Sequence, residues 1–208
     1  MVPVNAVPVF AREPVLDVLN TGSGFFAVTG TRVWLITAAH VPINMQVHSH
    51  WGTWPRQLWV CPAVQSSMAY ELFDALGAPL FRHVRDVSGM ADFMALETDP
   101  AAFLPSGALA RYEVLDLGNP IPPAPGQCVV AEGYPSVQRL WPYDPAEQLT
   151  GSVVRFDGGL IEIDSIPLKG FSGGPAFVLG GGLVGMTIGS QQGRGRLVRA
   201  SWIREQLP

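Results

Sequence analysis

Lysine and long apolar runs are scarce in this 208-residue chain, and each scarcity excludes a class of function. The chain has 13 basic side chains, of which Lys169 is the only lysine, and 17 acidic ones, so its formal net charge is -4. A mildly acidic protein has no general attraction for nucleic-acid phosphate. No run of about 18 apolar residues is present, so a membrane-spanning helix is not expected. We therefore expect neither nucleic acid nor a membrane as a partner.

Cysteine is scarce as well. Cys61 and Cys128 are the only two, which is too few for a disulfide framework, and no Cys-x-x-Cys spacing suggests zinc. Their number favours two buried, reduced thiols, while a single Cys61–Cys128 disulfide stays open. The apolar stretch at 1–10 has no basic segment before it, so we expect no secretion signal. Together these features predict a cytoplasmic protein.

The composition predicts an all-β fold. Hydrophobic residues make up 48% of the chain and charged residues only 14%, which excludes intrinsic disorder. Short runs rich in Val, Ile, Leu, Phe and Trp alternate with Gly and Pro, as in a chain of strands and turns. Glycine-rich hairpin turns are expected at 157–159 and 180–182. The predicted strands are 24–28, 32–37, 57–60, 93–96, 129–131, 152–156, 160–163, 175–179 and 183–188, with a helix at 200–207.

A proline-rich break at 119–126 divides these strands into two sets. We expect a single domain that spans 1–208 and contains two β modules. The first module is predicted at about 15–110, the second at about 111–199, and the helix follows the second module.

A serine among glycines is the first candidate for chemistry. Gly170-Phe171-Ser172-Gly173-Gly174-Pro175 precedes an apolar strand. Glycines around a serine leave its hydroxyl accessible and allow backbone N–H groups to converge on one spot, which a nucleophile and an oxyanion hole require. The alternative is an ordinary turn rich in Gly and Ser.

A histidine and an aspartate each lie at the end of an apolar strand. His40 follows the run 33–37 and the small residues Ala38 and Ala39, which leave room for the imidazole to turn toward a partner. Asp92 opens the run 93–96, where a carboxylate needs a hydrogen-bond donor, and an imidazole N–H is suitable. Each residue alone also has an ordinary structural explanation, as a satisfied local histidine or a solubilising charge.

In their order along the chain, these three segments resemble the chymotrypsin-like (trypsin-like) serine peptidases. The matching motifs are Thr-Ala-Ala-His ending at His40, the strand opened by Asp92, and Gly-x-Ser-Gly-Gly-Pro around Ser172. The segment at 22–26 resembles the family's strand before the histidine, so the resemblance covers about 15–207. It is closest to the bacterial trypsin-like and HtrA-like branch, because the chain contains Thr150-Gly151-Ser152 and has few cysteines. The resemblance implies two packed antiparallel six-stranded β-barrels with a short C-terminal helix.

The resemblance also implies a role for each motif residue. Ser172 attacks the scissile carbonyl. His40 takes the proton of the Ser172 hydroxyl and then donates it to the leaving amine, and Asp92 orients the imidazole. The backbone N–H groups of Gly170 and Ser172 form the oxyanion hole, and no metal or cofactor takes part. A nucleophile elbow of an α/β-hydrolase is excluded, because no histidine or aspartate follows Ser172 in the chain.

The sequence leaves two substrate preferences open, one for an apolar or small residue before the cleaved bond and one for acidic residues. The resemblance places Ile166 on the floor of the main pocket, which favours an apolar or small residue before the cleaved bond. Lys169 lies at the mouth and, with Arg194 or Arg196 nearby, favours acidic residues instead. The pocket wall and the strand that pairs with substrate are implied at Thr187, Ile188, Gly189 and Ser190.

Phe171 departs from the family pattern. Zymogen members have an aspartate there that pairs with a newly cut N-terminus, so we expect no zymogen-type activation here. The enzyme is then either constitutively active or controlled by a regulatory protein partner. The expected function is a serine endopeptidase acting on a protein or peptide. The alternatives are an inactive peptidase-like module that binds peptides or partners, and a serine esterase on the same scaffold.

The remaining histidines are weaker candidates. His48 and His50 form a His-x-His pair that could bind a metal, but a solvated loop is favoured because no third ligand is near in the sequence. His83 is expected in a surface loop.

Overall fold

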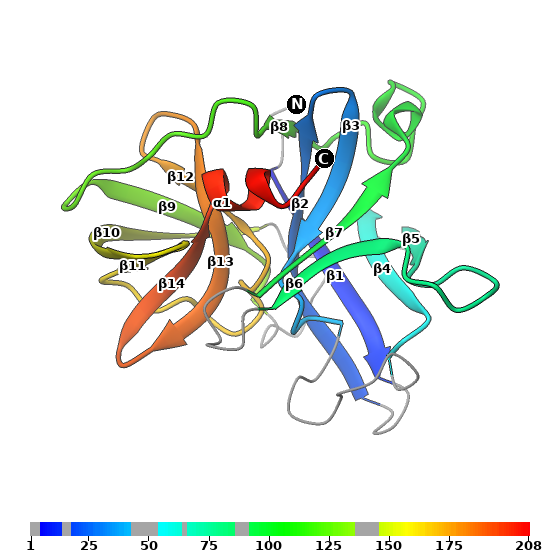
Figure 1. The fold of residues 1–208 in the computed structure, drawn as a ribbon, viewed down its shortest axis with the longest axis horizontal. Helices are drawn as coiled ribbons and strands as arrows, with labels where there is room; N and C mark the ends of the chain where they lie inside the picture. The colour runs from blue at the N-terminus through cyan, green and yellow to red at the C-terminus, as the bar shows by residue number, and fades with distance from the viewer. Residues whose placement is uncertain (1–4, 14–17, 43–53, 64–65, 86–91, 136–145) are drawn as a thin grey trace.

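The structure consists of two β modules that lie side by side (Figure 1). It is a computed structural model that describes residues 5–13, 18–42, 54–63, 66–85, 92–135 and 146–208. No helix in these ranges is long and apolar enough to cross a membrane. Both described modules are built almost entirely of antiparallel strands.

The first module is an eight-stranded sheet with the order β5-β4-β1-β2-β3-β7-β6, and β8 pairs in parallel with β2. Its strands are β1 (Ala6–Glu13), β2 (Val18–Thr29), β3 (Arg32–Thr37), β4 (Gln57–Ala63), β5 (Ser66–Glu71), β6 (Phe81–Arg85), β7 (Asp92–Thr98) and β8 (Val114–Asp116). A 3-10 helix, η2 (Pro100–Phe103), follows β7, and Asp99 caps it by accepting a hydrogen bond from the Ala101 amide.

The second module is a closed six-stranded barrel with the order β10-β11-β14-β13-β12-β9. Its strands are β9 (Cys128–Gly133), β10 (Glu147–Asp157), β11 (Leu160–Ile163), β12 (Pro175–Val178), β13 (Leu183–Gln191) and β14 (Arg194–Arg199), followed by the helix α1 (Ala200–Glu205). Glycines with positive φ, such as Gly158 (55°) and Gly180 (80°), form the expected hairpin turns.

The predicted all-β class, the closed second barrel and the C-terminal helix are confirmed, and every predicted strand overlaps an observed one. The first module differs in detail from a six-stranded antiparallel barrel, because its sheet has eight strands and includes one parallel pair. It also extends beyond the predicted range of about 15–110 at both ends. At the start, β1 pairs with β2 along its length; at the other end, β8 pairs with β2 after the predicted boundary.

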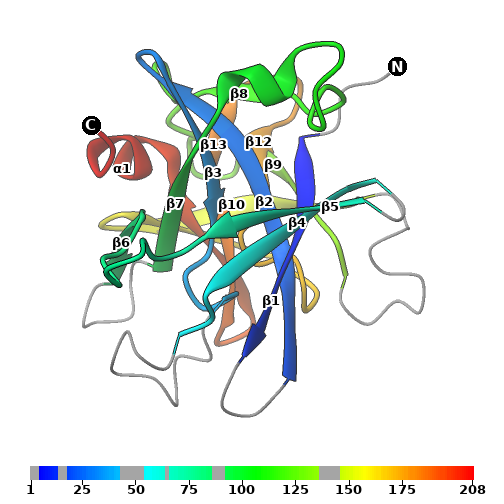
Figure 2. The same cartoon turned by 90° about the vertical axis from the view of Figure 1, so that its right-hand side faces the viewer.

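One hydrophobic core joins the two modules. Fully buried side chains of the first sheet, such as Phe25 and Phe93, belong to the same cluster as Met186 of β13 and Ile203 of α1. Figure 2 shows α1 to one side of the first sheet, on the side of β7. The ring of Trp202 packs edge-on against Phe93 at 6.2 Å between centroids. Because burial of shared apolar surface drives association, the two modules are held together by this core.

The proline-rich segment at 119–126 is the connection between the modules, as the sequence predicts. The Leu117 amide donates to the Val28 carbonyl at 3.1 Å, at the end of the first module. The Ile121 amide donates to the Leu183 carbonyl of β13 at 3.2 Å. The crossing chain is thus hydrogen-bonded to both modules.

Two predictions about single residues can be compared with the structure, and one was wrong. His83 does not lie in a surface loop but on β6, with its ring edge-on to Trp54 at 5.5 Å. Cys61 and Cys128 are both free thiols, as favoured, but each is half-buried rather than buried. Partial burial raises the pKa of the Cys61 thiol. His48 and His50 lie outside the described residues, so the solvated loop favoured for them over a metal site stays a prediction.

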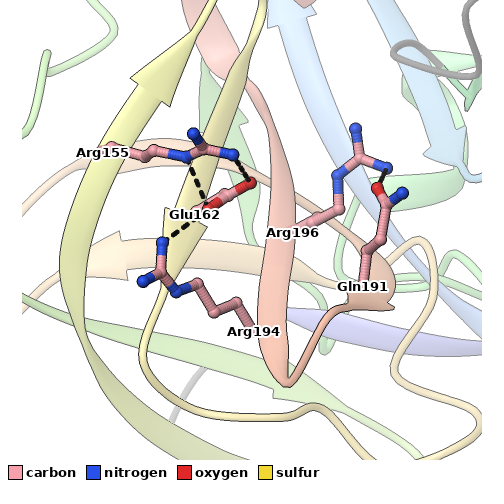
Figure 3. Close-up of polar contacts among 5 residues, drawn as sticks. All are labelled: Arg155, Glu162, Gln191, Arg194 and Arg196. Carbon is pink, nitrogen blue, oxygen red and sulfur yellow. Dashed lines mark hydrogen bonds and ion pairs between the residues drawn. The ribbon is translucent and has the colours of Figure 1, made fainter.

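A charged cluster crosses the outer surface of the barrel (Figure 3). Arg155 of β10 donates from Nε and a terminal nitrogen to the two carboxylate oxygens of Glu162 on β11, at 2.8 Å each, and Arg194 of β14 contacts the same carboxylate at 3.2 Å. Arg196 donates instead to the side-chain carbonyl of Gln191 at 2.6 Å. The hydrogen bonds from Arg155, aided by Arg194, lower the pKa of the Glu162 carboxyl to about 2.

Removing the Glu162 charge should reduce stability in a pH-dependent way. The folded-state pKa lies below the ordinary value of 4.5, so the stabilisation is complete above 4.5 and is lost as the pH falls to about 2. Glu162→Gln should therefore lower the melting temperature near neutral pH by about 2 °C, a small effect because water screens the exposed arginines. Thermal unfolding followed by circular dichroism, with Glu205→Gln as the control, measures it. A difference that does not shrink toward low pH would contradict this account.

Candidate active site

His40 and Asp92 meet because β3 and β7 are antiparallel neighbours. Thr37 at the end of β3 pairs with Met94 near the start of β7, so the turn that follows β3 lies beside the first residue of β7. The His40 backbone amide donates to one Asp92 carboxylate oxygen at 3.0 Å, and His40 Nδ1 makes a short hydrogen bond to the other. A carboxylate can only accept, so Nδ1 carries the proton and Nε2 is left as the acceptor.

His40 and Ser172 line the same pocket, which has a volume of about 320 Å³. His40 comes from the first module and Ser172 from the loop before β12 in the second, so the pocket lies where the modules meet. The other residues that line it are Leu19, Asn20, Thr21, Val41, Lys169 and Gly170. The side chain of His40 is 35% exposed and that of Asp92 is 15% exposed, so the imidazole is accessible while its carboxylate partner is shielded.

The backbone of the serine loop is held by hydrogen bonds to its carbonyl groups. The Leu168 carbonyl accepts from the Phe171 amide at 3.1 Å, and the Phe171 carbonyl accepts from the Gly174 amide at 2.9 Å. The carbonyl groups of Gly170 and Ser172 both accept from Ser23, the first from its hydroxyl and the second from its amide, at 2.8 Å each. The loop is thereby tied to β2 of the other module.

Two backbone amides of this loop differ from the others in having no hydrogen-bond acceptor among the described residues. Among the described residues, the N–H groups of Gly170 and Ser172 donate to no partner, whereas those of Phe171, Gly173 and Gly174 all do. Gly170 has φ = 102° in the turn closed by Phe171 and Leu168, the geometry of a type II turn that requires glycine at this position. An anionic atom near Ser172 could therefore be bound by two amides with no competing protein acceptor.

The buried side chain of Phe171 holds the serine loop against the end of β9. Its side chain is 1% exposed and lies directly against Gly133 at the end of β9, where an added Cβ would approach the Cα and Cγ of Phe171 to 2.8 Å. An aromatic side chain at this depth is fixed by packing rather than by charge. Position 171 therefore carries a buried apolar group, which cannot form an ion pair.

Comparison with known proteins adds the fold. No family model matches the sequence, and no curated protein matches it either. Among solved structures, a serine endoprotease from Yersinia pestis matches 97% of this chain and 60% of its own, with 18% identity and a TM-score of 0.62. The MamO protease domain from Magnetospirillum magneticum, in its apo form, matches 100% of this chain and 97% of its own, with 17% identity and a TM-score of 0.61.

The chain has the chymotrypsin-like serine peptidase fold. This bears out the fold expected from the three motifs. The chain spans only 60% of the Yersinia protein, so that protein contains a part with no counterpart here.

The predicted substrate-binding residues of this chymotrypsin-like chain are not all brought to the pocket. Lys169 is exposed and lines it, as the sequence predicts. Ile166 is 54% exposed and is not among the pocket-lining residues. Arg194 and Arg196 are engaged by Glu162 and Gln191, and neither lines the pocket.

The implied substrate strand belongs to β13. Thr187 is fully buried, whereas Ser190 is exposed, and Gly189 has φ = 122° where the β13–β14 register shifts. The bulge therefore lies at Ile188, between Thr187 and Gly189, and it re-aims the strand before Ser190. Like the pocket floor at Ile166, the substrate contacts of Thr187, Ile188, Gly189 and Ser190 stay predictions.

Ser23 is the site residue that the sequence reasoning missed. It is fully buried on β2, and its hydroxyl and amide both reach the serine loop. The available signal was the pair of glycines around it, since glycine inside a strand often marks a close backbone approach. A Cβ on Gly22 would lie 3.0 Å from the Ser172 carbonyl oxygen and 2.5 Å from a Val41 methyl group.

The contact between Gly133 and Phe171 can be tested with matched glycine variants. In Gly133→Ala the new methyl group meets Phe171, and overpacking of this kind costs about 1–3 kcal/mol of unfolding free energy. Gly181→Ala is the control, because a Cβ there has Ile121 as its nearest neighbour at 3.9 Å. Denaturant unfolding measures both variants. Equal stability of the two variants would show that Phe171 is not held tightly against β9.

Proposed function

We propose that the protein is a serine endopeptidase that hydrolyses peptide bonds of a protein or peptide substrate, with Ser172, His40 and Asp92 as its catalytic residues and no cofactor. The observation that carries the proposal is the pocket where His40, held by two hydrogen bonds to Asp92, lies with Ser172 and two unpaired amides. This set supplies a nucleophile, a base, an orienting carboxylate and an oxyanion site, which are the components of acyl transfer.

In the first half of the proposed reaction, His40 Nε2 accepts the Ser172 hydroxyl proton as the serine oxygen attacks the substrate carbonyl carbon. The Asp92 carboxylate stabilises the resulting imidazolium. The carbonyl oxygen becomes negatively charged and is bound by the N–H groups of Gly170 and Ser172. The C–N bond then breaks as His40 gives its proton to the leaving amine, which leaves an acyl group on Ser172.

In the second half, a water molecule replaces the amine. His40 takes a proton from the water as its oxygen attacks the acyl carbon, and the same two amides bind the oxyanion again. The ester bond to Ser172 breaks, the proton returns to the serine oxygen, and the carboxylic acid product leaves. The triad then has its starting protonation state.

We further propose that no N-terminal ion pair is needed for activation. The support is the buried side chain of Phe171 against Gly133, together with the hydrogen bonds that hold the loop carbonyls. A regulatory protein partner and a cytoplasmic location stay predictions from the sequence.

Labelling with a fluorophosphonate probe tests the proposal directly. The wild-type protein should form one adduct per chain, because Ser172 is activated by His40, and Ser172→Ala should abolish the adduct. Ser67→Ala, which removes an exposed hydroxyl on β5, should label like the wild type. Intact-protein mass spectrometry measures the extent of labelling.

A third variant examines the role of Asp92. Asp92→Asn should slow the turnover of a cleaved peptide by roughly 10⁴-fold, because the imidazole loses the partner that sets its tautomer. Asp99→Asn at the other end of β7 should leave turnover unchanged. A folded wild-type protein that takes up no probe would favour the inactive peptide-binding module, and one that cleaves esters but no peptides would favour the esterase.

A further inference from the structure

We propose that Ser23 is a positioning residue that sets the place of the oxyanion amides relative to His40, an inference that rests on the proposed function. Ser23 belongs to β2 of the first module, and its side chain is fully buried. Its hydroxyl donates to the Gly170 carbonyl at 2.8 Å and accepts from the Tyr134 amide at 2.8 Å. One hydroxyl therefore joins three segments: β2, the chain after β9 and the serine loop.

The hydroxyl completes the fixation of a single peptide unit. The peptide between Gly170 and Phe171 has its carbonyl bound by Ser23 and its N–H bound by the Leu168 carbonyl. With both polar groups held, this unit cannot move without breaking a buried hydrogen bond. Gly170 lines the pocket and its N–H has no acceptor among the described residues, so the place of this N–H follows from the Ser23 contact.

Ser23 also fixes the nucleophile, but through a different atom. Its backbone amide donates to the Ser172 carbonyl at 2.8 Å, and its own carbonyl accepts from the Thr37 hydroxyl at 2.7 Å, three residues before His40. Removing the side chain leaves these backbone links in place. Replacement of Ser23 should therefore loosen the Gly170 side of the loop more than the Ser172 side.

The surrounding strand is built for this contact. Gly22 and Gly24 flank Ser23, and a Cβ on Gly24 would lie 2.9 Å from the Ile36 carbonyl oxygen. Glycine inside a strand costs stability. A Cβ on Gly22 would lie 3.0 Å from the Ser172 carbonyl oxygen, so Gly22 allows close approach to the serine loop, whereas Gly24 allows close packing against β3. Catalysis is sensitive to displacements of about 1 Å, so a small shift of Gly170 is expected to reduce the rate.

The test compares Ser23→Ala with Thr98→Val in the full chain. Thr98 carries another buried hydroxyl of the same sheet, which donates to the Tyr70 hydroxyl at 3.3 Å at the end of β7 away from Asp92. Ser23→Ala should lower kcat by about 10–100-fold with KM changed less than about threefold, because transition-state binding is lost. Its affinity for a peptide boronic acid should fall by a similar factor. Thr98→Val should lower only the melting temperature.

Ser23→Cys is a second variant, for the case in which Ser23→Ala does not fold. Its thiol has a similar shape to the hydroxyl but is a weaker hydrogen-bond donor. Its kcat should lie between those of the wild type and Ser23→Ala. Unchanged kcat in Ser23→Ala, or an equal fall of kcat in Thr98→Val, would overturn the proposal and leave Ser23 a purely structural residue.

Amide hydrogen exchange separates this proposal from the proposed function. If the wild-type protein neither labels nor cleaves, the proposed function fails, and exchange at 168–174 still tests the positioning role. Faster exchange there in Ser23→Ala than in Thr98→Val supports it, and equal exchange in the two variants overturns it.

Discussion

The packing of the first sheet against the barrel is the constraint on which the whole site depends, because the site is divided between them. His40 and Asp92 come from the ends of β3 and β7, while Ser172 comes from a loop of the barrel. The shared core that includes Phe93, Met186 and Ile203 keeps these ends in place. Ser23 of the first sheet adds two direct hydrogen bonds to the serine loop, from its hydroxyl to the Gly170 carbonyl and from its amide to the Ser172 carbonyl. Loss of the packing would separate His40 from Ser172.

The hydrogen bonds of the serine loop explain how the loop keeps one shape without an ion pair at position 171. Phe171 is buried against Gly133, and the carbonyl groups of Gly170, Phe171 and Ser172 are each paired with an amide or with the Ser23 hydroxyl. Gly170, with its positive φ, lines the pocket, and its amide has no acceptor among the described residues. In the proposed function, burial of Phe171 and these hydrogen bonds hold the loop, and no N-terminal ion pair is needed.

Much of this architecture could be predicted from local sequence. Runs such as 32–37 and 183–188 are apolar and bounded by glycine, so their strands were clear, and the three motifs indicated the fold. The strands β1, β5, β6, β8 and β14 were missed. Their sequences mix apolar residues with proline, glycine, charge or short polar residues, and only pairing across the sheet makes them strands. Ser23 was noticed only as part of a motif, since its partners at Tyr134 and Gly170 are distant in sequence. The surroundings of Ile166 likewise depend on loop geometry that local pattern does not determine.

The most direct test of the account is a crystal structure of the protein with a peptide boronic acid bound. The account predicts a covalent bond from Ser172 Oγ to boron, one boronate oxygen about 2.7–3.1 Å from the amide nitrogens of Gly170 and Ser172, and His40 Nε2 within hydrogen-bonding distance of another. An inhibitor bound without the serine bond, or a loop in which the Gly170 amide points away from the boronate, would contradict it.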